Sequence, residues 1–241
     1  MSGPAGSHGG GRSGTVPRRR RFPGHAIWVG VLGFLALLVL GDSPATARSY
    51  PNIFGSKEIS STNWGVHTTA VINWMSMLKR WANGTPCAES NTCTTKGWQA
   101  LVAQVKAVGD PMAQIKLANS LMNNPAQHPY IEDINNWGQT DYWATVYQFL
   151  RKSGDCEDFS IAKYMLLKAA GYPIENMRIV AVRIKSLGGI GHAILVVYQG
   201  NKALVLDNRV APVMDEALVR SEFQPAISMN EQFWWVHLPG H

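Results

Sequence analysis

The sequence predicts an α+β fold, in which a helical N-terminal half packs on an antiparallel sheet from the C-terminal half. Two observations indicate this order. Apolar residues recur at helical spacing between residues 64 and 170, and short runs rich in Val, Ile and Leu follow between residues 178 and 238. No internal repeat divides either half, so one folded domain is expected.

Five helices are expected in the first half. They span Trp64 to Ala82, Gly97 to Val108, Pro111 to Met122, Asp141 to Leu150 and Glu157 to Ala170. Pro111 suits the first turn of the third helix, and Asp141 is expected to cap the fourth. Gly171 and Pro173 end the fifth helix. Residues 123–138 hold several Pro and Asn residues, which favours a loop.

Four strands are expected in the second half. They span Arg178 to Ile184, Ala193 to Tyr198, Ala203 to Leu206 and Phe233 to Leu238. Gly200 and Asn201 lie between the second and third of these strands, and this pair is typical of a two-residue hairpin turn. The hairpin would place the start of one strand beside the end of the next.

The first 47 residues have the three parts of a secretory signal. The basic run Arg18–Arg21 precedes a 15-residue apolar stretch, 26–40, and Ala45–Ala47 supplies small residues at a cleavage site. We expect cleavage after Ala47, a mature domain of residues 48–241, and a periplasmic location. The Arg19–Phe22 stretch also admits twin-arginine export. A membrane anchor is the alternative, although 15 residues are short for a bilayer span.

The basic charge of the chain is concentrated in this N-terminal segment. The full sequence has a formal net charge of +6, with 22 basic and 16 acidic residues. Five of the basic residues but only one acidic residue precede position 48, so the mature chain is close to neutral. The composition therefore gives no reason to expect nucleic-acid binding, and membrane contact is expected only through the signal segment.

The sequence contains three cysteines, which is an odd number for an exported protein. Cys87 and Cys93 lie in a short polar segment and favour a local disulfide, because no second Cys or His pair stands at metal-ligand spacing. Cys156 is then left unpaired, and an unpaired thiol in an oxidising compartment calls for a functional explanation.

Cys156 is one of three residues whose order and positions indicate nucleophilic catalysis. It follows Gly154 and Asp155 at the start of a predicted helix, and Asp155 is expected to cap that helix. There the helix dipole and free N–H groups favour a thiolate and can stabilise an oxyanion. His192 opens one strand and Asp207 closes the next, so the hairpin brings them to one sheet edge. His192 could then act as general base and Asp207 could orient it.

Several stretches of the sequence also resemble one family, the bacterial transglutaminase-like cysteine proteinases, which include LapG-like periplasmic proteases. The similar stretches are Asn135–Gly138, Asp141–Thr145, Gly154–Phe159, Ala162–Tyr164, Gly191–Leu195 and Val205–Asn208. They occur in the family's order across residues 50–240. The sequence departs from the family at Val146, where members often carry Pro.

The resemblance implies a papain/transglutaminase-like fold with a Cys156–His192–Asp207 triad. It also implies a Ca²⁺ requirement, with Asp155, Glu157 and Asp158 as ligands; hard carboxylate oxygens suit this ion. The alternative for these acids is that they complement the helix dipole. The family implies a surface adhesin as protein substrate and an inner-membrane receptor for cyclic-di-GMP as regulator.

The sequence alone leaves functions other than proteolysis open. A transglutaminase or a peptidoglycan amidase could use the same triad, because the triad does not determine the acyl acceptor. A non-catalytic calcium-dependent binding module is the alternative outside enzymes. Four tryptophans at or near helical spacing could form its binding face, but such a pattern more often belongs to a core. They are Trp64, Trp74, Trp81 and Trp98.

Overall fold

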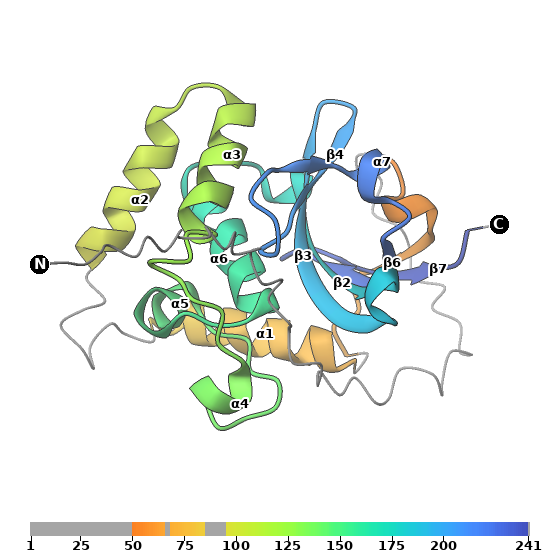
Figure 1. The fold of residues 1–241 in the computed structure, drawn as a ribbon, viewed down its shortest axis with the longest axis horizontal. Coiled ribbons are helices and arrows are strands. Elements are labelled where there is room, and N and C mark those ends of the chain that lie inside the picture. Colours follow the sequence, from red (N-terminus) through yellow and green to blue (C-terminus); the bar gives the residue numbers. More distant parts are fainter. Residues whose placement is uncertain (1–49, 66–67, 85–94, 241) are drawn as a thin grey trace, which may run out of the picture.

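The computed structural model describes residues 50–65, 68–84 and 95–240, in which a helical layer packs on one face of an antiparallel sheet (Figure 1). The α-helices are α1 (Thr69–Ala82), α2 (Thr95–Ala107), α3 (Pro111–Met122), α4 (Asp133–Asn136), α5 (Val146–Lys152), α6 (Cys156–Ala169) and α7 (Glu216–Val219). Short 3₁₀ helices are η1 (Ile53–Gly55), η3 (Ile174–Asn176) and η4 (Lys185–Leu187). The predicted α+β fold class is confirmed.

The sheet has seven strands, and every neighbouring pair is antiparallel. The strands are β1 (Lys57–Ser61), β2 (Met177–Ile184), β3 (Ile190–Gln199), β4 (Lys202–Leu206), β5 (Met214–Asp215), β6 (Phe223–Met229) and β7 (Trp234–Leu238). Their order across the sheet is β1-β7-β6-β2-β3-β4-β5. The two longest strands, β2 and β3, therefore lie near its middle.

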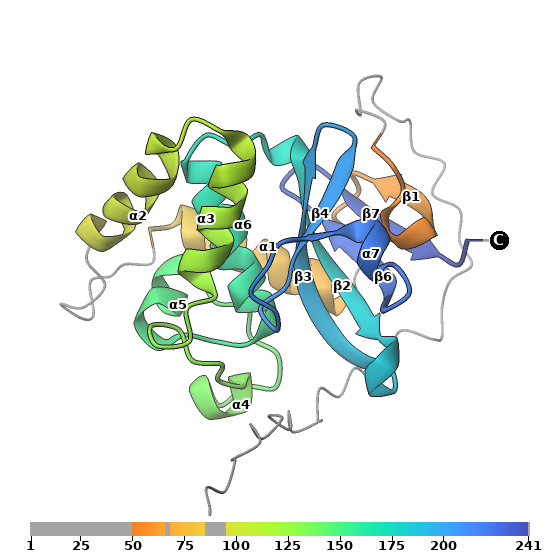
Figure 2. The same ribbon diagram turned by 45° about the horizontal axis from the view of Figure 1, so that its top comes forward.

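Both faces of the central strands are buried, and each face belongs to a separate core. Ile179 and Leu195 pack toward the helices, whereas their neighbours Val180 and Val196 pack on the opposite face against η1. Alternation of side chains across a strand explains this division. Two-sided burial also explains why these strands are nearly continuous apolar runs. Figure 2 shows the helical layer on one side of the sheet and α7 with η1 on the other.

The four tryptophans belong to the core. Trp74 and Trp98 are buried, and Trp64 and Trp81 are partly buried against the same cluster. The indole Nε1 of Trp74 donates to the Asn230 carbonyl oxygen at 3.0 Å. The core interpretation of these residues is confirmed.

Helix boundaries follow the capping residues. α3 has the predicted limits, and the Asp110 carboxylate accepts a hydrogen bond from the Ala113 N–H at 2.7 Å. α1 begins at Thr69 and not at Trp64, because Thr68 occupies the N-cap and its hydroxyl accepts from the Val71 N–H. The apolar periodicity alone could not show where this helix begins.

The prediction that Asp141 caps the fourth helix is wrong. The corresponding helix, α5, begins at Val146, and Thr145 and Gln148 form a reciprocal capping box at its N-terminus. The Thr-x-x-Gln spacing is a sequence signal for this box. Asp141 instead accepts a hydrogen bond from Nε1 of Trp143 at 3.0 Å.

Three strands were not predicted. β1 is polar and lies at an edge, and β5 has only two residues. β6 contains Pro225, which argues against a strand inside a sheet. The ladder between β2 and β6 accommodates the proline at a register shift between Ala181 and Val182.

The predictions for the N-terminal segment 1–47 and for Cys87 and Cys93 lie outside the described residues. In the part of the chain that the structure describes, no helix is long and apolar enough to cross a membrane.

Candidate active site

Cys156 is half-buried and is the first residue of α6, which packs against β3. The hydroxyl of Ser160, one turn later, donates to the Cys156 carbonyl at 2.9 Å and lies 3.2 Å from the Ala193 carbonyl. This contact ties the first turn of α6 to β3. The candidate nucleophile therefore lies beside the residue that follows His192.

The β3–β4 hairpin brings His192 and Asp207 together as predicted. Gln199 pairs with Lys202 across the two-residue turn, and β4 ends one residue before Asp207. Nε2 of His192 lies 2.9 Å from Oδ1 of Asp207, and both side chains are buried. Because a carboxylate only accepts, Nε2 carries the proton of this bond, which leaves Nδ1 of the neutral ring as the proton acceptor.

Arg209 was not assigned a role from the sequence, yet it holds the Asp207 carboxylate. Nε and Nη2 of Arg209 lie 3.0 and 2.8 Å from Oδ2, and the Arg209 N–H donates to Oδ1 at 2.9 Å. Burial raises the pKa of Asp207, but His192 and Arg209 outweigh burial and hold the pKa well below its usual range. Asp207 is therefore a fixed, ionised partner for the imidazole.

A cluster of five carboxylates surrounds the start of α6; we call it the acidic cluster. It consists of Asp133, Asp141, Asp155, Glu157 and Asp158. Three overlapping sets have potential ligand atoms within 4.8 Å of one another: Asp155 with Cys156 and Glu157, Asp133 with Asp141 and Glu157, and Asp133 with Asp155 and Asp158. The structure thus brings the three predicted acids together and adds two that the sequence analysis missed.

The ion pairs found among the residues that the structure describes include none to the acidic cluster. Burial is the largest cause that raises the pKa of Asp133 to about 7 and of Asp155 to about 6. It also raises the pKa of Glu157 and Asp158 well above the usual range, and repulsion between the carboxylates adds to this effect. Such a cluster is costly unless protons or a cation neutralise it.

Its geometry fits a divalent cation. Three buried oxygens have no hydrogen-bond partner among the described residues: Oδ1 of Asp133, Oδ1 of Asp155 and Oδ2 of Asp158. The second oxygens of Asp133 and Asp158 accept from the backbone N–H groups of Tyr142 and Ala144, which orients both carboxylates. Oriented hard oxygen donors with unused lone pairs are the ligands that Ca²⁺ takes in proteins.

Asp155 occupies the N-cap of α6, but its carboxylate accepts no capping hydrogen bond from the helix. The expected capping role is therefore wrong, and Oδ1 of Asp155 belongs to the acidic cluster. Gly154 permits the close packing here, because a Cβ at this position would lie 2.0 Å from Oδ2 of Asp158.

The same carboxylates influence the thiol. Burial raises the pKa of Cys156, and Glu157 and Asp155 raise it further; the thiol also donates to Oε2 of Glu157 at 3.1 Å. The backbone N–H of Ala193 acts in the opposite direction and lowers this pKa. The expectation that the helix N-terminus favours the thiolate is therefore opposed by the acids beside it. A cation in the acidic cluster would weaken that opposition.

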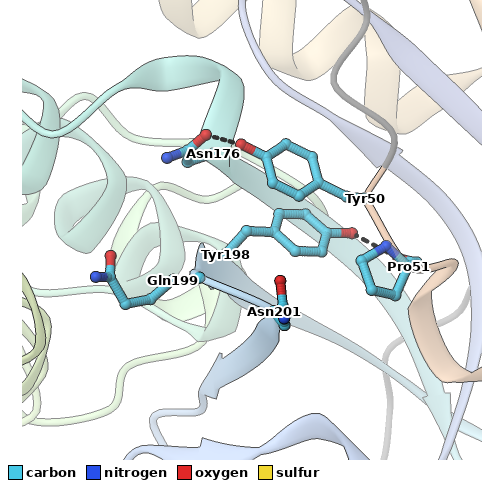
Figure 3. A pocket seen from close by; sticks show the side chains of 7 residues that line it. Tyr50, Pro51, Asn176, Tyr198, Gln199 and Asn201 are labelled. Atoms are coloured by element: carbon cyan, nitrogen blue, oxygen red, sulfur yellow. Dashed lines mark hydrogen bonds between the residues drawn. The ribbon is translucent and has the colours of Figure 1, made fainter.

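A polar pocket of about 800 Å³ lies at the other end of β3. Its lining includes Tyr50, Asn176 and Tyr198, and the rings of the two tyrosines stack with centroids 4.2 Å apart (Figure 3). Tyr198 is six residues from His192, roughly 20 Å along a strand. This pocket is therefore separate from the site around Cys156.

A cysteine at a helix N-terminus beside a His–Asp pair on an antiparallel sheet defines a transglutaminase-like cysteine protease fold. Residues 85–241 match the family model described as bacterial transglutaminase-like cysteine proteinase BTLCP. The chain belongs to this family and is a cysteine protease.

Solved structures of LapG from Legionella pneumophila are similar to the chain. The calcium-bound structure aligns with a TM-score of 0.51 and 29% identity over 58% of this chain and 76% of that chain. The EGTA-treated structure aligns with a TM-score of 0.50 and 29% identity, over 58% of this chain and 74% of that chain. No curated protein gave a significant sequence match.

Proposed function

We propose that this chain is a periplasmic cysteine endopeptidase in which Cys156 is the nucleophile, His192 the general base and Asp207 the residue that orients it. The observation that carries this proposal is the buried 2.9 Å contact between His192 and Asp207 beside the first turn of α6. An inert core cysteine would need no such pair. The N-terminal segment 1–47 supports export, because it has the parts of a secretory signal.

The reaction follows from the positions of these groups. Nδ1 of His192 takes the thiol proton, and Sγ of Cys156 attacks the scissile carbonyl carbon. The backbone N–H of Cys156 is the candidate donor to the oxyanion. The imidazolium, stabilised by Asp207, then protonates the leaving amine, and water deprotonated by His192 hydrolyses the thioester.

Calcium is the cation that we propose for the acidic cluster, with Asp133, Asp155 and Asp158 as central ligands and Glu157 and Asp141 beside them. The three unpartnered oxygens support it, as does the calcium-bound form of the similar Legionella protein. When bound, the ion supplies positive charge that offsets the carboxylates next to the thiol. This neutralisation favours the thiolate that the reaction needs.

The substrate that we propose is a large cell-surface adhesin or another envelope protein, cut in the periplasm. Similarity to LapG supports a protein substrate, and the expected export of the chain supports this compartment. By the same family resemblance, an inner-membrane receptor that responds to cyclic-di-GMP would restrain the enzyme.

The experiment uses the full chain expressed with its leader and purified from the periplasmic fraction. It is incubated with Ca²⁺ and the N-terminal region of an adhesin from the same cell, with Cys156→Ala as control. A discrete cut found by mass spectrometry for the wild type alone is the expected result. Absence of a cut with a thiol that resists alkylation at neutral pH would contradict the protease assignment.

A labelled primary amine in the same reaction separates hydrolysis from acyl transfer. We expect both new termini to be free, because the acyl acceptor is water. Attachment of the amine to a glutamine side chain, with release of ammonia and no cut, would indicate a transglutaminase instead.

A further inference from the structure

A polar cluster of two buried side chains and one half-buried side chain lies next to Asp207, between α3, α6 and the turn that follows β4. We call it the α3–α6 cradle; it consists of Asn119, Asn123 and Lys163. None of the three belongs to the acidic cluster or touches Cys156 in the contacts of the described residues. The proposed reaction assigns them no role.

Lys163 is fully buried on α6. Its Nζ donates to the Leu206 carbonyl at 3.2 Å and lies 3.4 Å from Oδ1 of Asn119. It forms no ion pair with a carboxylate among the residues that the structure describes. Burial lowers the pKa of Lys163 to about 7, and the charge of Asp207 acts in the opposite direction.

The two asparagines bind the same turn from α3. Nδ2 of Asn123 donates to the Asp207 carbonyl at 2.9 Å and lies 3.3 Å from the Val210 carbonyl. Nδ2 of Asn119 donates to the Ala211 carbonyl at 2.9 Å. With the bond from Lys163, four carbonyls between residues 206 and 211 receive donors from the cradle.

The turn itself lies outside the strands of the sheet. β4 ends at Leu206 and β5 begins at Met214, so residues 207–213 have no partner strand. The turn carries both Asp207 and Arg209, the two groups that fix the imidazole. The position of the Asp207 carboxylate therefore depends on the bonds that hold the backbone of the turn.

Stability alone gives little reason for a lysine at position 163. An amine that forms no ion pair pays a desolvation cost in the interior, even when it is hydrogen-bonded. An apolar side chain of similar length fills the same volume without that cost. A buried polar group that costs stability in this way is expected where function requires it.

We propose that Lys163 is a positioning residue for the proteolytic reaction. Through its contacts with the Leu206 carbonyl and the α3 asparagines, Lys163 holds Asp207 in register with His192. The inference rests on the proposed roles of His192 and Asp207. Lys163 does not contact substrate; it acts through the turn.

The test replaces Lys163 by an apolar side chain of similar length, Lys163→Met. Lys168→Met is the matched control, since Lys168 lies on the same helix and pairs at the surface with Glu231. We expect Lys163→Met to keep or raise the melting temperature, to lower kcat about tenfold or more, and to leave KM within about twofold, because a small displacement of a catalytic group mainly affects the chemical step. The control should retain wild-type kinetics.

Two further measurements keep the test decisive. Asn123→Ala removes the donor to the Asp207 carbonyl at a half-buried position, and it should reduce kcat in the same way. The Nε2 proton of His192, observed by NMR, should shift or broaden in both variants and not in Lys168→Met. Unchanged kcat and an unchanged resonance in Lys163→Met would overturn the positioning role. If the wild type cleaves nothing, the proposed function fails, and the resonance still tests the cradle.

Discussion

The site has two groups of carboxylates: the first is Asp207, and the second is the acidic cluster. They differ in what neutralises their negative charge. Asp207 has a guanidinium and an imidazole within hydrogen-bond distance, and its pKa lies well below the usual range. In the acidic cluster, burial and repulsion between the carboxylates raise the pKa values. A carboxylate that orients a base must stay ionised, whereas oxygens without partners are suited to an ion from solution.

Arg209→Met tests the first group. Loss of the guanidinium should raise the pKa of Asp207 toward its ordinary value and let the carboxylate rotate, so kcat/KM should fall about 10- to 100-fold. The acid limb of the pH–rate profile should move to higher pH, because Asp207 becomes protonated sooner. Arg220→Met is the matched control: Arg220 makes the same two-nitrogen contact with Glu216 beyond β4. A profile that keeps its acid limb in Arg209→Met would contradict this account.

Gly154→Ala tests the second group. The added Cβ would lie 2.0 Å from Oδ2 of Asp158, so the Asp158 carboxylate must leave the position that it holds in the acidic cluster. We expect calcium affinity, measured by calorimetry, to fall about tenfold or more. Gly109→Ala is the control, because a Cβ there meets nothing within 4 Å. Equal affinities for the two variants would show that Asp158 does not bind the ion.

At the scale of elements, local signals predicted more than long-range ones. The start of α3 follows from Asp110 and Pro111, and the β3–β4 hairpin follows from Gly200 and Asn201. The hairpin in turn placed His192 beside Asp207, so this part of the candidate site could be predicted from neighbouring elements.

Contacts between distant segments could not be predicted in this way. Asp133 and Asp141 reach the acidic cluster only because the loop before α5 folds back onto the start of α6, where the Ile131 N–H donates to the Gly154 carbonyl at 2.9 Å. The spacing of residues 123–145 gives no signal that this loop folds back onto the start of α6. β6 was not predicted for a similar reason. Pro225 argues against a strand, and the register shift in β2 that accommodates it is not visible in the sequence of β6.

A buried histidine joins three elements at the other end of the sheet. Nδ1 of His237 on β7 lies 2.8 Å from the Ser56 hydroxyl, and Nε2 lies 2.8 Å from the Ser228 hydroxyl on β6. Burial, with a smaller contribution from the charge of Arg178, lowers its pKa to about 3, while Glu58 lies 3.8 Å from Nδ1. The ring is therefore neutral in the folded chain, and it gains a proton more readily when the chain unfolds.

The sign of the resulting pH dependence follows. Between the unfolded pKa of about 6.5 and the folded value of about 3, the unfolded state binds more protons, so this group favours unfolding as the pH falls. From pH 7.5 to 4.5 the wild type should lose about 2–3 kcal/mol of unfolding free energy relative to His237→Gln. Urea denaturation of both proteins at each pH, with a chelator present, measures this difference. Parallel curves would show that His237 is protonated in the folded chain.

At the scale of the whole molecule, the acidic cluster connects parts that are distant in the sequence. Asp133 begins α4, Asp141 lies before α5, and Asp158 lies in the first turn of α6. These carboxylates repel one another where the helical layer meets the nucleophile. An ion that binds them would join these segments and so contribute to folding as well as to chemistry.

Calcium should therefore stabilise the whole domain and not only activate it. At a free concentration 100 times the dissociation constant, binding adds about 2.7 kcal/mol, which raises the melting temperature of a domain of this size by roughly 5–10 °C. A chelator should reverse the shift. Mg²⁺ should give a smaller shift, because it demands a tighter octahedral geometry and dehydrates reluctantly.

Asp158→Asn removes one unpartnered charge and should reduce the calcium shift, whereas Asp110→Asn, at the N-cap of α3, should leave it intact. If calcium raises neither the melting temperature nor the activity of the wild type, the remaining explanation for these carboxylates is that they complement the helix dipole.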